Sequence, residues 1–472
     1  MKKILAIVLV TLSLGCSEKD TKKGAAVSKR DSPNVIYILA DDLGYGDLGC
    51  FGQDKIKTPN LDRMAQEGIV FTDHYAGNTV CAPSRASLMT GLHQGHAPIR
   101  GNTNNVLREN TFTIGQLFKS AGYATALIGK WGLGDLGSSG TPDKQGFDHY
   151  FGYLNQILAH NYYPDYLIKD GDSVRLANEV VKATKGYAKG KGQAATVKKE
   201  YAHNLFIAEA LSWIETHRND PFFLYLPLTI PHANNEGTLT AGHGMEVPDL
   251  GSYAHRDWPD AEKAKAAMIS LLDEDVGRIL HLLQILGLDQ NTMVIFTSDN
   301  GPHREGGVDP NFFDSNGPLR GTKRDLYEGG IRVPFITQWK GKIAPGAKSH
   351  LPSAFWDMMP TFAEVLHVDL KENTDGISLM PALLGNTAIN ARERTGYLYW
   401  EFGEGKYDAQ AVREGKWKLL YVYRTDSWEL YDLSKDIGEN ENVIAKHPAV
   451  AQRLKKRMAE AREPHGVYPL GD

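Results

Sequence analysis

Two pairs of oxygen-bearing side chains are the first residues in this sequence whose types and spacing could support chemistry. Asp41-Asp42 follows the apolar run 34–40, and Asp299-Asn300 follows the apolar run 293–297. Short, uninterrupted apolar runs are typical of strands buried on both faces of a parallel sheet, and such sheets bind ligands at their carboxyl edge. Four oxygen ligands there could hold a hard divalent cation, with Ca²⁺ the first expectation. Either pair alone is more often a turn or capping feature.

A cysteine opens the second chemically notable stretch, residues 81–91, which read CAPSRASLMTG. Pro83 lacks an N–H group, so we expect a helix to begin at or near it, and Gly91 suits the position after its end. Cys81 would then lie just before a helix N-terminus, where free N–H groups and the helix dipole favour a thiolate or an anionic ligand. The alternative is a buried structural cysteine.

Cationic and imidazole side chains recur in loops near these stretches. Arg85 follows the cysteine by four residues, Lys130 follows the apolar run 124–128, and His232 and Lys323 lie in loops further along the chain. Each could be an exposed charge or an ordinary hydrogen-bonded loop residue. Several cations beside a metal and a nucleophile would instead form a site for a tetrahedral oxyanion, either sulfate or phosphate.

Alternating strand and helix patterns must position these groups. The sequence predicts an α/β fold with a large, doubly wound, mainly parallel sheet over residues 34–370. After about residue 370, short aromatic segments predict an antiparallel sheet, so we expect a smaller α+β subdomain over residues 371–472. Residues 170–200 are rich in Lys, Gly and Ala and are expected to form an exposed excursion. The expected helices are 58–68, 201–217, 261–286 and 448–461, and the other expected strands are 69–75, 222–228, 397–402, 411–413, 417–423 and 428–433.

Length and composition limit the classes of protein. A chain of 472 residues is too long for one ordinary core, which favours two domains. With 42% hydrophobic and 23% charged residues it is typical of a soluble globular protein. Its net charge of −5 argues against a nucleic-acid partner and means that an anionic substrate needs a local cationic pocket.

The N-terminus predicts export. Lys2 and Lys3 precede an apolar run, residues 4–14, that is too short to span a membrane, so residues 1–15 are expected to be a signal peptide. The ending Ser13-Leu14-Gly15-Cys16 resembles a bacterial lipoprotein signal, although Leu is usual where Ser13 stands. We therefore expect Cys16 to be lipidated, residues 16–33 to form a tether, and the membrane contact to be through the lipid alone, in the periplasm or at the outer membrane. Ordinary secretion is the alternative, and an exported chain could pair Cys50 with Cys81.

Taken together and in order, the motifs resemble those of type I sulfatases, members of the alkaline-phosphatase-like superfamily. The resemblance runs from about residue 33 to 445, and the cysteine motif is its most specific part. The matching stretches are Asp41-Asp42-Leu-Gly-Tyr-Gly-Asp, Cys81-Ala-Pro-Ser-Arg85, Gly129-Lys130-Trp131, Pro231-His232, Ser298-Asp299-Asn300-Gly301, Gly321-Thr322-Lys323, Tyr327-Glu328-Gly329-Gly330 and Trp428-Glu-Leu-Tyr-Asp-Leu433.

The resemblance implies a different chemistry for Cys81. In this family a maturation enzyme oxidises that cysteine to formylglycine, and a hydroxyl of the hydrated aldehyde attacks the sulfur of a sulfate ester. By the same implication Arg85 supports the nucleophile, Lys130 and Lys323 contact the sulfate, and His232, alone or with Lys323, is the general acid. One Ca²⁺ ion would be held by Asp41, Asp42, the modified Cys81, Asp299 and Asn300.

One position departs from the family pattern and leaves a step open. The family usually has His after Gly-Lys-Trp, where it helps to eliminate sulfate, and this chain has Gly132. Another base, such as a His from a substrate loop, or water would have to serve.

Loop residues suggest a sugar substrate, because His, Arg and amide groups fix sugar hydroxyls. We expect Arg100, Asn102, His160 and His303 to bind the substrate, a sulfated glycan attacked from its end. The chain also resembles galactosamine-type sulfatases, and this resemblance favours sulfated galactose or N-acetylgalactosamine. The alternatives are an arylsulfatase of broad specificity, a phosphate or phosphonate ester hydrolase of the same superfamily, and a non-catalytic glycan-binding lipoprotein.

Overall fold

The computed structural model describes residues 32–103, 105–185, 188–385, 396–468 and 470. The predicted signal peptide and Cys16 lie outside the described residues, as does nearly all of the predicted tether. Within the described ranges, none of the helices combines the length and the apolar character needed to cross a membrane.

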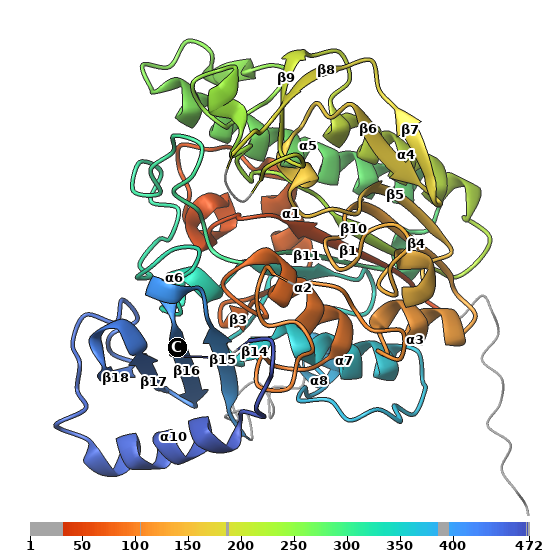
Figure 1. Cartoon of the computed structure of the whole chain (residues 1–472). Helices are drawn as coiled ribbons and strands as arrows, with labels where there is room; N and C mark the ends of the chain where they lie inside the picture. Colours follow the sequence, from red (N-terminus) through yellow and green to blue (C-terminus); the bar gives the residue numbers. More distant parts are fainter. Residues whose placement is uncertain (1–31, 104, 186–187, 386–395, 469, 471–472) are drawn as a thin grey trace, which may run out of the picture.

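A ten-stranded sheet forms the centre of the larger part of the molecule (Figure 1). Its five middle strands are all parallel, which confirms the predicted mainly parallel sheet. Both edges are mixed, because β12 runs antiparallel to β11 and β6 runs antiparallel to β5. In spatial order the strands are β13 (Ala347–Ser349), β2 (Ile69–Phe71), β12 (Phe335–Gln338), β11 (Thr292–Ser298), β1 (Asn34–Ala40), β10 (Phe222–Pro227), β4 (Ala124–Lys130), β5 (His149–Tyr153), β6 (Tyr166–Lys169) and β7 (Asp172–Arg175).

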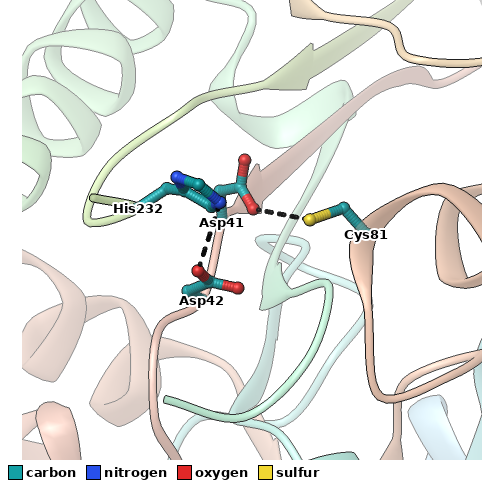
Figure 2. A group of neighbouring side chains, drawn as sticks. All are labelled: Asp41, Asp42, Cys81 and His232. Atoms are coloured by element: carbon teal, nitrogen blue, oxygen red, sulfur yellow. Dashed lines mark hydrogen bonds and ion pairs between the residues drawn. The ribbon is translucent and has the colours of Figure 1, made fainter. Parts of the chain in front are cut away.

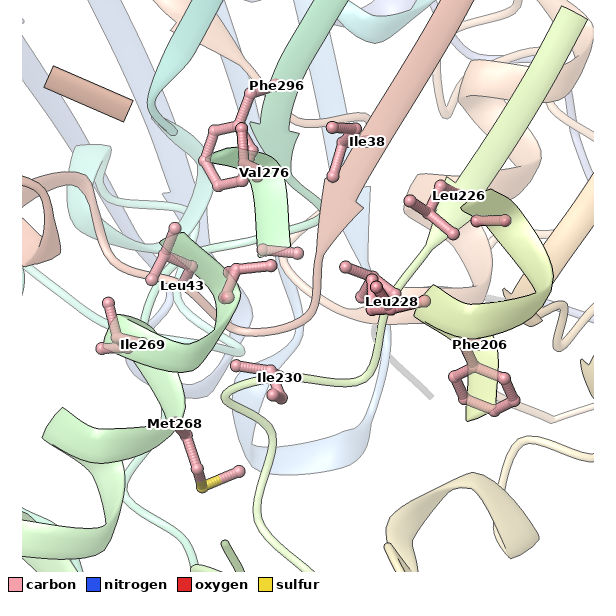
Figure 3. Packing of buried hydrophobic residues seen from close by; sticks show 14 of the residues in the cluster. Ile38, Leu43, Phe206, Leu226, Leu228, Ile230, Met268, Ile269, Val276 and Phe296 are labelled. Carbon is pink, nitrogen blue, oxygen red and sulfur yellow. The ribbon is translucent and has the colours of Figure 1, made fainter. Parts of the chain in front are cut away.

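Helices cover both faces of this sheet because its middle strands are apolar on both sides. In β1, Ile36 and Ile38 pack into one core, while Val35, Tyr37 and Leu39 pack into the other. Figure 3 shows part of the first core, where Ile38 lies with side chains of α4, α5 and the neighbouring strands. The first core includes residues of α1 (Pro59–Glu67), α4 (Ala202–Thr216) and α5 (Asp260–Ile285), and the second those of α2 (Cys81–Thr90), α3 (Ile114–Ser120), α7 (Met358–Val365) and α8 (Met380–Leu383).

Most described residues of the segment 170–200 are exposed, as its composition predicts, but the segment also forms strands and has a buried part. It contains β7, which extends the large sheet, and a separate pair formed by β8 (Glu179–Lys182) and β9 (Gln193–Val197). The start of β9 is buried, since Ala194 and Ala195 are almost inaccessible. The small side chains around Ala194 and Ala195 give only a weak hydrophobic signal in the sequence, but they allow close packing in the structure. Another two-stranded sheet joins β3 (His74–Tyr75) to β14 (Ser353–Ala354).

A separate antiparallel sheet of four strands follows, as the aromatic segments predict. The strands are β15 (Leu398–Phe402), β16 (Ala409–Glu414), β17 (Trp417–Val422) and β18 (Ser427–Asp432), and α10 (Pro448–Glu460) packs on one face (Figure 1). The boundary at residue 370 between the two parts stays a prediction.

Buried charges connect the C-terminal sheet to a helix of the larger part of the molecule. Lys418 on β17 lies 2.9 Å from Glu328 at the start of the short helix α6 (Glu328–Ile331) and 2.9 Å from Glu439. All three side chains are inaccessible to solvent. Burial alone would raise the pKa of Glu328, but the charges of Lys418 and Arg332 outweigh it and lower that pKa to about 2. A charge buried this way is stable only with its partner.

Replacing Lys418 therefore tests this connection. We expect Lys418→Ala to lower the free energy of unfolding by about 3–5 kcal/mol, because it removes the cation that pairs with the buried Glu439 and leaves the buried Glu328 with Arg332. Lys416→Ala is the matched control, since Lys416 is 44% exposed and its pair with Asp432 should contribute only about 0–1 kcal/mol. Urea unfolding of the two variants measures the difference. Equal losses would show that the buried pair does not stabilise the fold.

Candidate active site

The carboxyl ends of the parallel strands bring the predicted metal ligands together. Ala40 at the end of β1 pairs in register with Ser298 at the end of β11, so the two acid-bearing pairs that follow them are neighbours. The backbone N–H of Asp42 donates to Asp299 Oδ1 at 3.1 Å, and Asn300 Nδ2 donates to Asp42 Oδ1 at 2.7 Å. All four predicted ligands, Asp41, Asp42, Asp299 and Asn300, are fully buried.

Cys81 lies beside these acids, with its Sγ donating to Asp41 Oδ1 at 3.4 Å (Figure 2). The helix begins at Cys81 itself, earlier than Pro83 suggested, because proline is tolerated within the first turn and Ser84 N already bonds to Val80 O. The surroundings of Cys81 do not favour a thiolate. Burial, reinforced by the negative charge of Asp41, raises the pKa of the Cys81 thiol to about 12, so the thiol stays protonated. The described residues leave Cys50 and Cys81 unpaired.

Each buried carboxylate has a cation of its own. Lys130, the last residue of β4, donates to Asp41 Oδ2 at 2.6 Å, and Lys323 donates to Asp42 Oδ2 at 2.8 Å. Burial opposes ionisation of Asp41, but the charge of Lys130, helped by other nearby cations, holds its pKa well below the usual value. Arg85 donates from Nε and Nη2 to Asp299 Oδ2 at 3.0 and 2.8 Å and from Nη1 to Lys130 O at 2.8 Å.

The group still has ligand capacity that the protein does not satisfy. Asn300 Oδ1 is buried and accepts no hydrogen bond. Burial and the charge of Asp41 raise the pKa of Asp299 to about 7. The nearby protein cations therefore do not fully compensate the negative charge of the buried carboxylates. Asp42 has φ 65°, a left-handed conformation that is uncommon outside glycine and tends to mark functional sites. The donor set is mainly oxygen, so these residues fit a hard divalent cation.

His232 lies against the acids from the loop after β10, and one atom each of Asp41, Asp42, Cys81 and His232 falls within 4.8 Å of the others (Figure 2). Its Nδ1 lies 2.7 Å from Ala233 O, an acceptor, so Nδ1 carries the hydrogen. Its Nε2 then accepts from Lys323 Nζ at 3.1 Å. The imidazole and the lysine thus form one hydrogen-bonded pair in the group.

Two of the four residues predicted to bind substrate surround His232. The ring of His160 stacks on it with centroids 5.0 Å apart, and the ring of His303 lies 6.0 Å away. Both are held from behind, His160 by Glu236 at 3.2 Å and His303 by donating to Pro231 O at 3.1 Å.

The other two residues predicted to bind substrate, Asn102 and Arg100, make hydrogen bonds to different parts of the protein. Asn102 accepts at Oδ1 from Ala82 N, so it supports the turn that carries Cys81. Arg100 donates to Glu401 and to Ala97 O and Glu463 O, contacts that attach its loop to the C-terminal sheet. Its substrate-binding role stays a prediction.

Two carboxylates in this region are not among the predicted site residues, although the sequence places Glu305 in a loop expected to rim the site. Glu305 lies 3.4 Å from Lys323 Nζ, and Glu236 orients His160. Glu305 comes directly after the His303-Arg304 loop, which is a weak signal, and Glu236 had none, because its pairing with His160 spans 76 residues.

At Gly132, the position that departs from the family pattern, a larger residue would have to displace the end of the Gln156 side chain. Gly132 has φ 76°, and a Cβ placed on it would lie 2.5 Å from Gln156 Oε1. That oxygen is buried and accepts no hydrogen bond. The side chain of Gln156 therefore lies against the space that a residue with a side chain would need.

Comparison with known proteins places the chain in a family. Residues 33–368 match the Sulfatase family, and residues 321–464 match the family described as N-sulphoglucosamine sulphohydrolase, C-terminal. The chain belongs to the sulfatase family, with the alkaline-phosphatase-like fold, and it is an enzyme that hydrolyses sulfuric esters.

Curated relatives and solved structures agree with this assignment. An N-acetylgalactosamine-6-O-sulfatase of Bacteroides thetaiotaomicron is 30% identical over 96% of this chain and 97% of its own length. An N-acetylgalactosamine-6-sulfatase of Rattus norvegicus is 33% identical over 87% of this chain and 75% of its own. The crystal structure of Ps i-CgsB in complex with k-i-k-neocarrahexaose superposes with a TM-score of 0.75 at 27% identity, over 91% of this chain and 92% of that one.

Calcium titration tests the proposed ion site. We expect Ca²⁺ to raise the melting temperature and a chelator to lower it, because an ion at 100 times its Kd adds about 2.7 kcal/mol to the folded state. Asp42→Asn should lose most of this response, since it removes a charged ligand. Asp172→Asn, at an exposed position on β7, should keep it. A full response in Asp42→Asn would show that the ion binds elsewhere.

Restoring a histidine at position 132 should destabilise the protein. Gly132→His combines a left-handed backbone, costing about 1–2 kcal/mol in a residue with a Cβ, with displacement of Gln156. Gly190→His is the matched control, because Gly190 has the same φ of 76° and nothing within 4 Å of an added Cβ. Thermal unfolding should show the larger loss at 132, and adding Gln156→Ala should recover part of it. Equal losses in the two histidine variants would contradict a steric role for Gln156.

Proposed function

We propose that this sulfatase removes sulfate from the end of a sulfated glycan, using a formylglycine made from Cys81 and one Ca²⁺ ion. The observation that carries the proposal is the position of Cys81 at the first turn of α2, with Sγ 3.4 Å from Asp41 Oδ1 and among oxygen ligands. A protonated thiol is a poor nucleophile and a soft ligand. An aldehyde hydrate at the same place would present oxygen atoms that suit both the attack and a hard cation.

The ion would be held by Asp41, Asp42, Asp299, Asn300 and the modified residue 81. When bound, Ca²⁺ supplies positive charge that polarises the nucleophilic oxygen and the sulfate. Arg85 fixes Asp299 and the end of β4 in place through three hydrogen bonds. Lys130 and Lys323 hold the sulfate oxygens from two sides, since their ammonium groups already lie against the acids that surround the proposed ion.

The proton for the departing sugar oxygen comes from the pair formed by Lys323 and His232. Burial and the charge of Lys323 lower the pKa of His232 well below its usual value, so the imidazole is neutral in the structure described. Its Nε2 accepts a hydrogen bond from the lysine, which carries the proton. With no imidazole at position 132, either another base, such as a histidine of a substrate loop, or water takes up the proton when sulfate is eliminated from residue 81.

A sugar substrate has support from the relatives and from the site. Two relatives are named for the 6-sulfate of N-acetylgalactosamine, and a similar structure contains a neocarrahexaose. The imidazoles of His160 and His303 flank the proposed acid and could bind sugar hydroxyls. Sulfated N-acetylgalactosamine or galactose is our first choice. The predicted lipoprotein signal fits export to the periplasm or the outer membrane, where such glycans are met.

A comparison of substrates tests this function. The protein would be produced together with a formylglycine-maturation enzyme, and mass spectrometry would show the loss of sulfur at Cys81. We expect sulfate release from 6-sulfated N-acetylgalactosamine or galactose to exceed phosphate release from a matched phosphate ester. Cys81→Ala should lower kcat by on the order of 10⁶, as for other nucleophiles. Cys50→Ala, at the other described cysteine, should keep the activity.

Three outcomes would contradict the proposal in different ways. Faster hydrolysis of the phosphate ester would indicate a phosphate or phosphonate hydrolase. Activity on aryl sulfates alone would indicate a broad arylsulfatase. Glycan binding without turnover by fully modified protein would indicate a binding protein.

A further inference from the structure

A chain of charged side chains leads from the proposed sulfate clamp to the surface. Lys323 lies 3.4 Å from Glu305 Oε2, and the other oxygen of Glu305 lies 2.7 Å from Arg324 Nη1. Glu404 follows, with Oε2 4.0 Å from Arg324 Nε. Lys323 is only 4% exposed, whereas Glu305, Arg324 and Glu404 are 22%, 28% and 33% exposed. These three residues, the charged rim, therefore begin at the buried clamp and end in solvent.

The backbone of Arg324 is unfavourable for an arginine. Its φ of 79° lies in the left-handed region that favours glycine. Its N–H donates to Thr79 O at 3.1 Å, which holds this residue against the turn that leads into Cys81. A strained conformation in a residue with a long side chain indicates that the side chain itself has a use there.

Glu404 reaches the rim from the C-terminal sheet, in the loop between β15 and β16. Its carboxylate accepts a hydrogen bond from the backbone N–H of Asn102. Asn102 in turn accepts from Ala82 N, next to Cys81. The rim is thus connected to both sides of the nucleophile turn, through Thr79 before it and Ala82 after it.

Stability alone gives no reason for the outer part of this arrangement. The pairs of Arg324 with Glu305 and Glu404 are between side chains that are 22–33% exposed, so water and salt screen them in part. A guanidinium with five N–H donors, flanked by two carboxylates that accept, instead offers the mixed donors and acceptors that bind neighbouring hydroxyl groups of a sugar ring.

We propose that Glu305, Arg324 and Glu404 form the subsite that determines specificity for the sulfated sugar, by binding ring hydroxyls next to the sulfate held by Lys130 and Lys323. This inference rests on the proposed function. It also gives the C-terminal sheet a direct part in substrate selection, through Glu404.

The test compares two substrates for each variant, a sulfated N-acetylgalactosamine or galactose and a small aryl sulfate whose ring lacks hydroxyls. Arg324→Gly and Glu404→Gln should lower kcat/KM for the sugar sulfate roughly 10- to 100-fold more than for the aryl sulfate, the range for losing hydrogen bonds to a charged group. The lower kcat/KM for the sugar sulfate should come mainly from a higher KM, with little change in kcat. Arg324→Gly should melt at the same or a higher temperature, because glycine relieves the backbone strain.

Arg453→Ala is the matched control. Arg453 on α10 also pairs with a glutamate, Glu414, at 2.6 Å, and it lies on the C-terminal part of the chain away from the rim. It should leave the ratio of the two activities unchanged.

The outcomes separate this inference from the function on which it rests. Equal losses on both substrates, or a lower melting temperature with an unchanged ratio, would assign the rim a structural role and overturn the inference alone. A wild-type enzyme that hydrolyses the aryl sulfate but no sugar sulfate would overturn the proposed substrate, and this inference with it.

Discussion

At the carboxyl edge of the central sheet, Asp41, Asp42 and Asp299 place three carboxylates in a region without solvent. Burying a carboxylate without a partner costs several kcal/mol, so the positions of their neighbours follow from this constraint. Lys130, Lys323 and Arg85 each donate a hydrogen bond to one of these acids, Asp41, Asp42 and Asp299 respectively. The three cations lie on a strand, a loop and a helix that are distant in sequence. The unsatisfied oxygen of Asn300 and the raised pKa of Asp299 show that the compensation by protein cations is incomplete.

The same constraint explains which parts of the site the sequence could reveal. The ends of the strands can be predicted from the sequence, because an apolar run followed by Asp41-Asp42 or Asp299-Asn300 indicates both the strand and the residue at which it ends. A parallel sheet then places both pairs at the same edge. The structure adds that the two strands are adjacent, which makes the pairs neighbours. The motif around Cys81 can be recognised in the sequence as a family resemblance, but the protonation state of its thiol cannot be predicted from it. Only the structure shows that burial beside Asp41 keeps the thiol protonated.

Contacts between loops that are distant in the sequence could not be predicted from it. Glu236 supports His160, and Glu404 approaches Arg324, without any local pattern that marks either glutamate. The mixed edges of the sheet and the strands within 170–200 were also missed, since short strands with small or charged residues carry a weak periodic signal. Arg100 was predicted from its place in a loop near the cysteine motif, and nothing in the sequence indicated that it also donates hydrogen bonds to Glu401 and Glu463 O in the C-terminal part of the chain.

That second sheet does more than close the fold. Its buried Lys418 anchors it to Glu328, at the start of the short helix that follows the Lys323 loop, so the loop carrying the proposed sulfate contact is fixed from the C-terminal side. Glu404 extends from the same sheet toward the surface beside that loop. The buried Lys418 and the partly exposed Glu404 thus belong to the same sheet, Lys418 on β17 and Glu404 in the loop between β15 and β16. A sheet held this firmly can place Glu404 against a substrate with little loss of conformational freedom, which is the condition under which a rim residue discriminates between sugars.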